Sequence, residues 1–157
     1  MSSKKVKEEP MVEKVERTGE EITVDMTQAR VLEPLDPSRP YLCAVSAWKP
    51  GKSASGGRKL HYELTAVEPV EMANRKVMED ISLDNEFTLG RLLQLLTAIG
   101  FPKEDIKKKN FILPKEDDVL GLQCTVWVRT QMSDVYGDRS RIRRLRPASV
   151  YGEVATV

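Results

Sequence analysis

Hydrophobic and polar residues alternate along several short segments of the chain, and this alternation predicts β-strands. The clearest segment runs from about Lys59 to Val67, where apolar side chains occupy every second position from Leu60 to Ala66. A period of two indicates a strand with one face in the core and the other in water. Four further segments are predicted as strands: Tyr41 to Trp48, Arg75 to Leu83, Leu122 to Arg129, and about Arg139 to Arg146.

The period changes after the third predicted strand, and the new spacing predicts a helix. Asn85 is a suitable N-cap, and Gly100 followed by Pro102 is a natural C-terminal stop. A second short helix is expected from Pro102 to Lys109. The apolar stripe of the first helix consists of Leu89, Leu92, Leu93, Leu96 and Ile99.

The resulting order is three strands, a helix and two strands. We expect a mostly β protein, a five-stranded, partly open OB-fold barrel with its helix between strands three and four. An α+β sheet with the helix on one face is the main rival. In the last strand only Ile142 and Leu145 are apolar, at a spacing of three, which predicts a β-bulge.

The length of 157 residues predicts one domain with tails. Residues 1–21 are rich in lysine and glutamate, and we expect a disordered charged tail. Residues 22–40 contain three prolines and are expected to be extended, residues 41–150 to form the OB-fold domain, and residues 151–157 to form a tail. Residues 1–40 carry 7 Lys/Arg against 9 Asp/Glu, whereas residues 139–146 hold five arginines and no acid.

The chain shows neither a signal-peptide pattern nor a run of ~20 apolar residues, so we expect a cytoplasmic protein. Cys43 and Cys124 each lie in a predicted strand among apolar neighbours. We interpret them as buried free thiols in a reducing compartment.

Few groups in the sequence could support catalysis. Gly51-Lys52-Ser53 resembles the end of a phosphate-binding loop, but Ser46 stands where that motif needs its first glycine. His61 is the only histidine, and no metal-ligand spacing accompanies it. We therefore expect a protein that is not an enzyme and that uses no cofactor and no metal.

Aromatic and basic residues occur together in two regions, which favours the binding of single-stranded nucleic acid. Aromatic rings can stack on bases while lysine and arginine attract phosphates. The aromatic candidates are Trp48, Trp127 and Tyr136. The polar and basic candidates are Lys49, Lys52, Arg58, Lys59, His61, Arg129, Arg139, Arg141 and Arg143.

Two of these features also have structural explanations. Trp127 falls on the polar side of its strand, where a base could stack on it, or the extended N-terminal segment or a partner subunit could cover it. Arginines on an edge strand can serve to block edge-to-edge association. Five arginines within residues 139–146 exceed what this purpose requires, so we favour phosphate contact.

Three stretches resemble a known family. They are FTLGRLLQLLTAIG (87–100), LGLQCTVWVRTQ (120–131) and RSRIRRLRP (139–147). With them, residues 41–146 resemble the phage-encoded single-stranded-DNA-binding proteins with an OB-fold. The resemblance implies a role in phage DNA replication or recombination, with replication or recombination proteins as further partners.

Our first hypothesis is a protein that binds single-stranded DNA with low sequence specificity through base stacking and phosphate contacts. The alternative is an OB-fold interaction module of a larger assembly, with no nucleic-acid role. Trp127 and the arginines would then form a protein interface.

Overall fold

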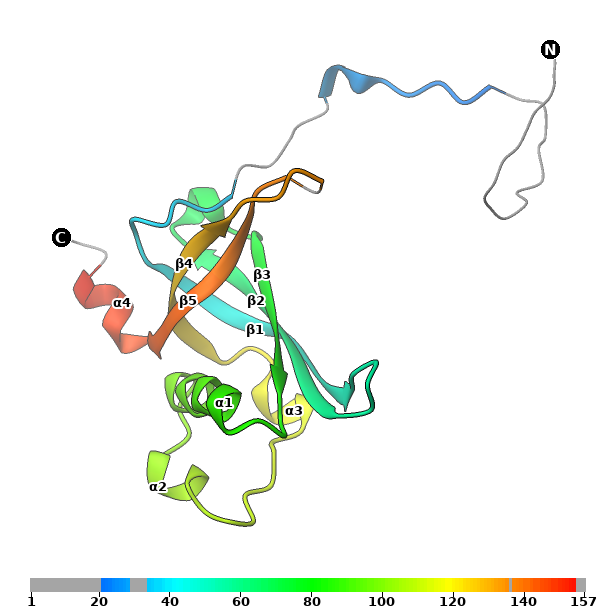
Figure 1. Ribbon diagram of the computed structural model, residues 1–157. Helices are drawn as coiled ribbons and strands as arrows, with labels where there is room; N and C mark the ends of the chain where they lie inside the picture. The colour runs from blue at the N-terminus through cyan, green and yellow to red at the C-terminus, as the bar shows by residue number, and fades with distance from the viewer. Residues whose placement is uncertain (1–20, 29–33, 136, 155–157) are drawn as a thin grey trace. The chain divides into compact units, whose positions relative to one another are not determined.

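The computed structural model describes residues 21–28, 34–135 and 137–154 (Figure 1). The chain divides into two compact units, and the described residues of the first contain one 3-10 turn, η1 (Met26–Gln28). The described residues from 34 onward belong to the second unit. The charged tail predicted to be disordered comprises residues 1–21. All of it except Glu21 lies outside the described residues.

The second unit is built on a five-stranded antiparallel sheet with the order β3-β2-β1-β4-β5. Its edge strands, β3 and β5, contact each other, but no hydrogen-bonded ladder joins them in the described part of the chain. The sheet is therefore open at this seam. The strands are β1 (Tyr41–Lys52), β2 (Arg58–Glu68), β3 (Lys76–Ser82), β4 (Gln123–Gln131) and β5 (Arg139–Pro147).

The alternation that predicted the strands also positions the core. In β2, Leu60, Tyr62, Leu64 and Ala66 are all buried, whereas the intervening side chains are partly exposed. Each strand starts or ends within a few residues of its predicted limit. The mostly β architecture predicted from the sequence is confirmed.

The largest difference in the strands is at the first hairpin. The first strand was predicted to end at Trp48, but β1 continues to Lys52, which pairs with Arg58 at the start of β2. Only residues 53–57 form the turn, closed by a hydrogen bond from the amide of Ser53 to the carbonyl of Gly57 (2.7 Å). Extending the ladder satisfies backbone groups that a loop would leave to water.

The predicted bulge in β5 is confirmed. Trp127 pairs with Arg144, whereas the next residue of β4, Val128, pairs with Ile142. Arg143 is therefore the extra residue. The bulge lets both Ile142 and Leu145 point into the core despite their spacing of three.

Helix α1 (Glu86–Ala98) begins and ends as predicted. The side chain of Asn85 accepts a hydrogen bond from the amide of Phe87 (2.8 Å). At the other end Gly100 has a φ of +115°, which a residue with a Cβ adopts only with strain. The predicted stripe needs one correction, because Leu89 is 40% exposed while Leu95 is fully buried.

Two side chains of α1 cover the seam between β3 and β5. Arg91 places its Nε 3.3 Å from a carboxylate oxygen of Glu79 on β3, and its Nη2 donates to the carbonyl of Ile142 on β5 (3.1 Å). Gln94 accepts a hydrogen bond from the amide of Leu145 (3.2 Å). The helix thus supplies polar partners where a strand-to-strand ladder is missing.

Short helical segments complete the unit. They are η2 (Val70–Met72), α2 (Lys103–Ile106), α3 (Glu116–Val119) and α4 (Ser149–Val154). Helix α2 is shorter than predicted, and α3 and α4 were not predicted. Helix α4 packs against β4 and β5, so part of the predicted C-terminal tail is ordered structure. None of the helices in the described residues is long and apolar enough to cross a membrane.

The two cysteines are buried and opposite each other, on β1 and β4, and both are free thiols. Burial raises the pKa of Cys43 to about 12 and raises that of Cys124 as well. Because the thiolate is the reactive form, we expect iodoacetamide at pH 8 to leave the native protein unmodified. Mass spectrometry should find two modified cysteines after unfolding in guanidinium, and rapid modification of the native protein would contradict the burial.

Candidate nucleic-acid interface

The predicted binding residues fall into two groups at opposite ends of the sheet. One group lies around the β1–β2 hairpin, and the other lies on the β4–β5 hairpin. Strand β4 pairs with the beginning of β1 only, at residues 41–44, and then continues past it, away from the β1–β2 turn. Figure 1 shows the two hairpin turns far from each other, the first in teal and the second in orange. One continuous cluster of all predicted residues is therefore absent.

Acidic residues offset much of the charge at the β1–β2 end. Asp84 accepts three hydrogen bonds from Arg58: from the side-chain Nε (2.9 Å) and Nη2 (2.7 Å), and from the backbone amide (2.8 Å). These hydrogen bonds lower the pKa of the Asp84 carboxyl, so it stays ionised beside the guanidinium. Arg58 is thus already engaged by a carboxylate that a phosphate would have to displace.

Asp80 is likewise the carboxylate partner of two further candidate residues, Lys59 and His61. It contacts Nδ1 of His61 at 2.5 Å and Nζ of Lys59 at 3.4 Å. The hydrogen bond from His61, followed by the charge of Lys59, lowers the pKa of the Asp80 carboxyl. Lys49 and Lys52 are exposed and make no ion pair with a described residue, so they remain available at this end.

The β4–β5 hairpin carries a different surface, which we call the arginine ribbon. In the cross-strand register Arg129 stands opposite Arg141, and Gln131 stands opposite Arg139. Arg129 and Arg143 are exposed and Arg141 is half-buried. None of these three forms an ion pair within the described part of the chain. The ribbon comprises Arg129, Arg139, Arg141, Arg143, Arg144 and Arg146.

Neutral groups, not acids, order several ribbon arginines. Nε of Arg141 donates to the side-chain oxygen of Gln131, and Nη1 of Arg146 donates to the carbonyl of Leu145 (2.9 Å). Like charges opposite each other on neighbouring strands repel. Arg129, Arg141 and Arg143 have no carboxylate partner among the described residues, so this part of the ribbon has a strong attraction for an external polyanion.

Trp48 is not part of any surface, which corrects the prediction that it stacks on bases. Its side chain is 1% exposed, its Nε1 donates to the carbonyl of Pro114 (2.9 Å), and its ring lies 6.5 Å from that of Tyr62. The cause is a bulge in β1. The register shifts between Val45 and Ala47, which turns Trp48 to the same side as Val45.

Trp127 lies on the outer side of β4, as its position in the alternation predicts, yet it is only 9% exposed. The guanidinium carbon of Arg144 lies over its indole ring, 4.3 Å from the centroid. A cation–π contact of this kind is worth about 0.5–2 kcal/mol. An arginine of the neighbouring strand thus lies over Trp127, which differs from the covers expected from the sequence.

Arg144 and Arg146 also belong to the ribbon; phosphate contact was favoured for the arginine run that contains them, but they were not named individually as candidate binding residues. The bulge at Arg143 determines which arginines of β5 point outward. The spacing of three between Ile142 and Leu145 predicts this bulge, and it could therefore have identified Arg144 as an outward side chain. Tyr136, the third predicted aromatic residue, lies outside the described residues.

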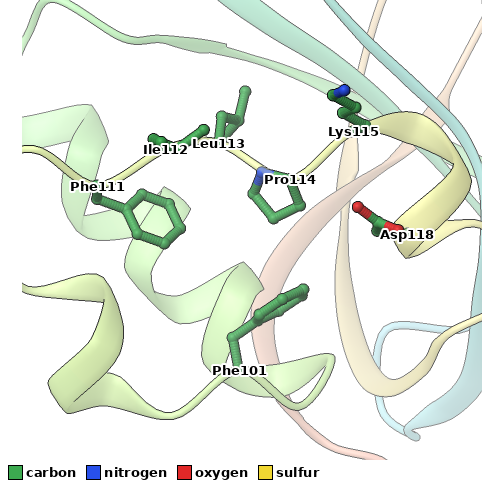
Figure 2. A pocket seen from close by; sticks show the side chains of 7 residues that line it. All are labelled: Phe101, Phe111, Ile112, Leu113, Pro114, Lys115 and Asp118. Atoms are coloured by element: carbon green, nitrogen blue, oxygen red, sulfur yellow. The ribbon is translucent and has the colours of Figure 1, made fainter.

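A shallow apolar depression lies beside the sheet, in the connection from α2 to α3. Its volume is about 380 Å³, and Figure 2 shows the rings of Phe101 and Phe111 turned toward the space below Pro114. Lys115 and Asp118 are the only charged residues in its lining. The Pro114 carbonyl is the acceptor for Trp48, so this segment is attached to the core.

Among the described residues, no three His, Cys, Asp or Glu side chains are grouped so as to hold a metal ion. A comparison with models of protein families finds no match, and neither does a comparison with curated protein sequences. The candidate function therefore depends on the geometry and charge of the ribbon.

Proposed function

We propose that this protein binds single-stranded DNA on the arginine ribbon, with low sequence specificity. The observation that carries the proposal is that Arg129, Arg141 and Arg143 have no carboxylate partner within the described part of the chain. Single strands present a phosphate at each nucleotide, and cationic grooves follow such backbones largely independently of sequence. Because Trp48 is buried and Trp127 is covered, phosphate contact is the main source of affinity in this proposal.

We further propose that the domain is an OB-fold. Support comes from the strand order β3-β2-β1-β4-β5, from the position of α1 between β3 and β4, and from the contact between β3 and β5. Five strands in this arrangement are typical of that fold. With the resemblance of residues 41–146 to phage single-stranded-DNA-binding proteins, we propose a role in phage DNA replication or recombination, in the host cytoplasm.

One observation favours the alternative, an OB-fold interaction module that does not bind nucleic acid. Met132 and Val135, in the turn of the β4–β5 hairpin, are 76% and 78% exposed. Apolar side chains beside arginines are typical of the centre of protein interfaces. A partner protein would then cover the same hairpin.

The test is a titration of the full chain against fluorescein-labelled oligo-dT, followed by anisotropy over a range of salt concentrations. We expect binding at about 50 mM salt and a linear fall of log K with log[salt], by ~0.7 for each phosphate contacted. Duplex DNA and RNA of equal length measure the preference among nucleic acids. If no oligonucleotide binds at about 50 mM salt, the proposal is wrong and the interaction module takes its place.

A further inference from the structure

The guanidinium of Arg144 lies over an aromatic ring of the neighbouring strand. The group lies 4.3 Å from the centroid of Trp127. Its Nε is buried and has no hydrogen-bond partner, the only such side-chain atom in the described part of the chain. A buried polar atom without a partner calls for an explanation, because such atoms are rare in folded proteins.

The bulge in β5 accounts for the position of this side chain. Arg143 is the extra residue, and in a regular strand Arg144 would fall on the same side as Ile142, which points into the core. The bulge sends Arg144 outward, opposite Trp127. Bulges commonly redirect a side chain in this way beside functional sites.

The guanidinium carbon lies over the indole, while the residue as a whole is only half-buried. The terminal nitrogens have no hydrogen-bond partner among the described residues and are not fully buried, so they reach solvent. The guanidinium thus already lies against the indole before any ligand arrives. Planar guanidinium groups are established stacking partners for unpaired bases.

We propose that Arg144 is the base-stacking platform of this protein: a nucleobase of the bound strand lies on the guanidinium, which in turn lies on Trp127. This inference rests on the proposed function and names the residue that contacts a base. The strand would cross the ribbon with its phosphates on Arg129, Arg141 and Arg143 and with one base turned toward Arg144. The buried indole serves the site by holding the platform flat.

The experiment compares two oligonucleotides of equal length and charge, oligo-dT and an abasic chain with the same phosphates. The measured quantity is the ratio of their dissociation constants, which isolates the contribution of the bases. Arg144→Lys keeps the charge and removes the plane. We expect it to leave abasic binding unchanged and to reduce the dT preference by about tenfold, a typical effect of losing one stacked base.

The neighbouring bulge residue provides the matched control. Arg143→Gln removes a charge from an exposed side chain that contacts no ring. It is expected to weaken both oligonucleotides equally, by roughly eightfold at about 50 mM salt, and to leave their ratio unchanged. Circular dichroism and thermal unfolding are measured for both variants and should match those of the wild type.

Each remaining outcome overturns the inference in a distinct way. A wild-type dT preference that survives Arg144→Lys rules out the platform, and equal binding of dT and abasic chains by the wild type does so as well. A preference that increases in the variant indicates that bases stack directly on Trp127 after Arg144 moves away. If the wild-type protein binds neither chain, the proposed function fails too.

Discussion

Replacing Arg129, Arg141 and Arg143 together by glutamine is expected to weaken single-stranded-DNA binding by on the order of 10²–10³-fold at about 50 mM salt. Each phosphate contact on a single strand contributes ~0.7 to the slope of log K against log[salt]. Relative to 1 M salt, one such contact is worth roughly eightfold at about 50 mM, and three multiply to several hundredfold. The salt slope should fall by about 2. Anisotropy titrations with oligo-dT at several salt concentrations measure both quantities.

The matched control removes three charges from the other end of the sheet. Lys52, Arg58 and Lys59 are replaced by glutamine, which leaves the net charge of the two triple variants equal. Because Asp84 and Asp80 already engage Arg58 and Lys59, we expect a loss of about tenfold or less. Equal losses in the two variants would mean that binding follows the overall charge and not the ribbon.

The sequence predicted the fold largely because its signals are local. Alternation in β2 depends only on neighbouring residues, and so do the cap at Asn85 and the stop at Gly100. Each of these signals has a physical cause within a few residues. The alternation reflects one buried face of β2, the cap is the side-chain acceptor of Asn85, and the stop is the left-handed backbone of Gly100. The open seam between β3 and β5 has no such local signal, because Arg91 and Gln94 reach it from a separate element.

The interface was harder to predict because it depends on cross-strand register. The pairing of Arg58 with Asp84 and of His61 with Asp80 joins residues 26 and 19 positions apart. Nothing in the sequence shows that these acidic residues lie opposite these basic residues. The position of Arg144 over Trp127 likewise depends on where the bulge falls.

The two bulges also show why one aromatic residue was misplaced. A spacing of three between Ile142 and Leu145 correctly predicted the bulge in β5. Val45 and Trp48 have the same spacing, and β1 has a bulge between them. Had this spacing been interpreted in the same way, Trp48 would have been assigned to the core.

Trp48→Ala is expected to lower the free energy of unfolding by about 3–5 kcal/mol, the usual cost of deleting a large buried aromatic side chain. The substitution leaves a cavity beside Tyr62 and removes the hydrogen-bond donor of the Pro114 carbonyl. Urea denaturation followed by far-UV circular dichroism measures the change, because the variant loses one of only two tryptophans.

Trp48→Phe distinguishes a core role from a binding role. Phenylalanine keeps most of the ring volume but cannot donate to Pro114, so we expect a smaller loss of stability, about 1–2 kcal/mol. At a temperature where the variant is fully folded, its affinity for oligo-dT should stay within about twofold of the wild type, because a side chain that is 1% exposed offers no face to a base. If the variant is folded but binds with strongly reduced affinity, Trp48 contributes to the binding surface, which contradicts its position in the core.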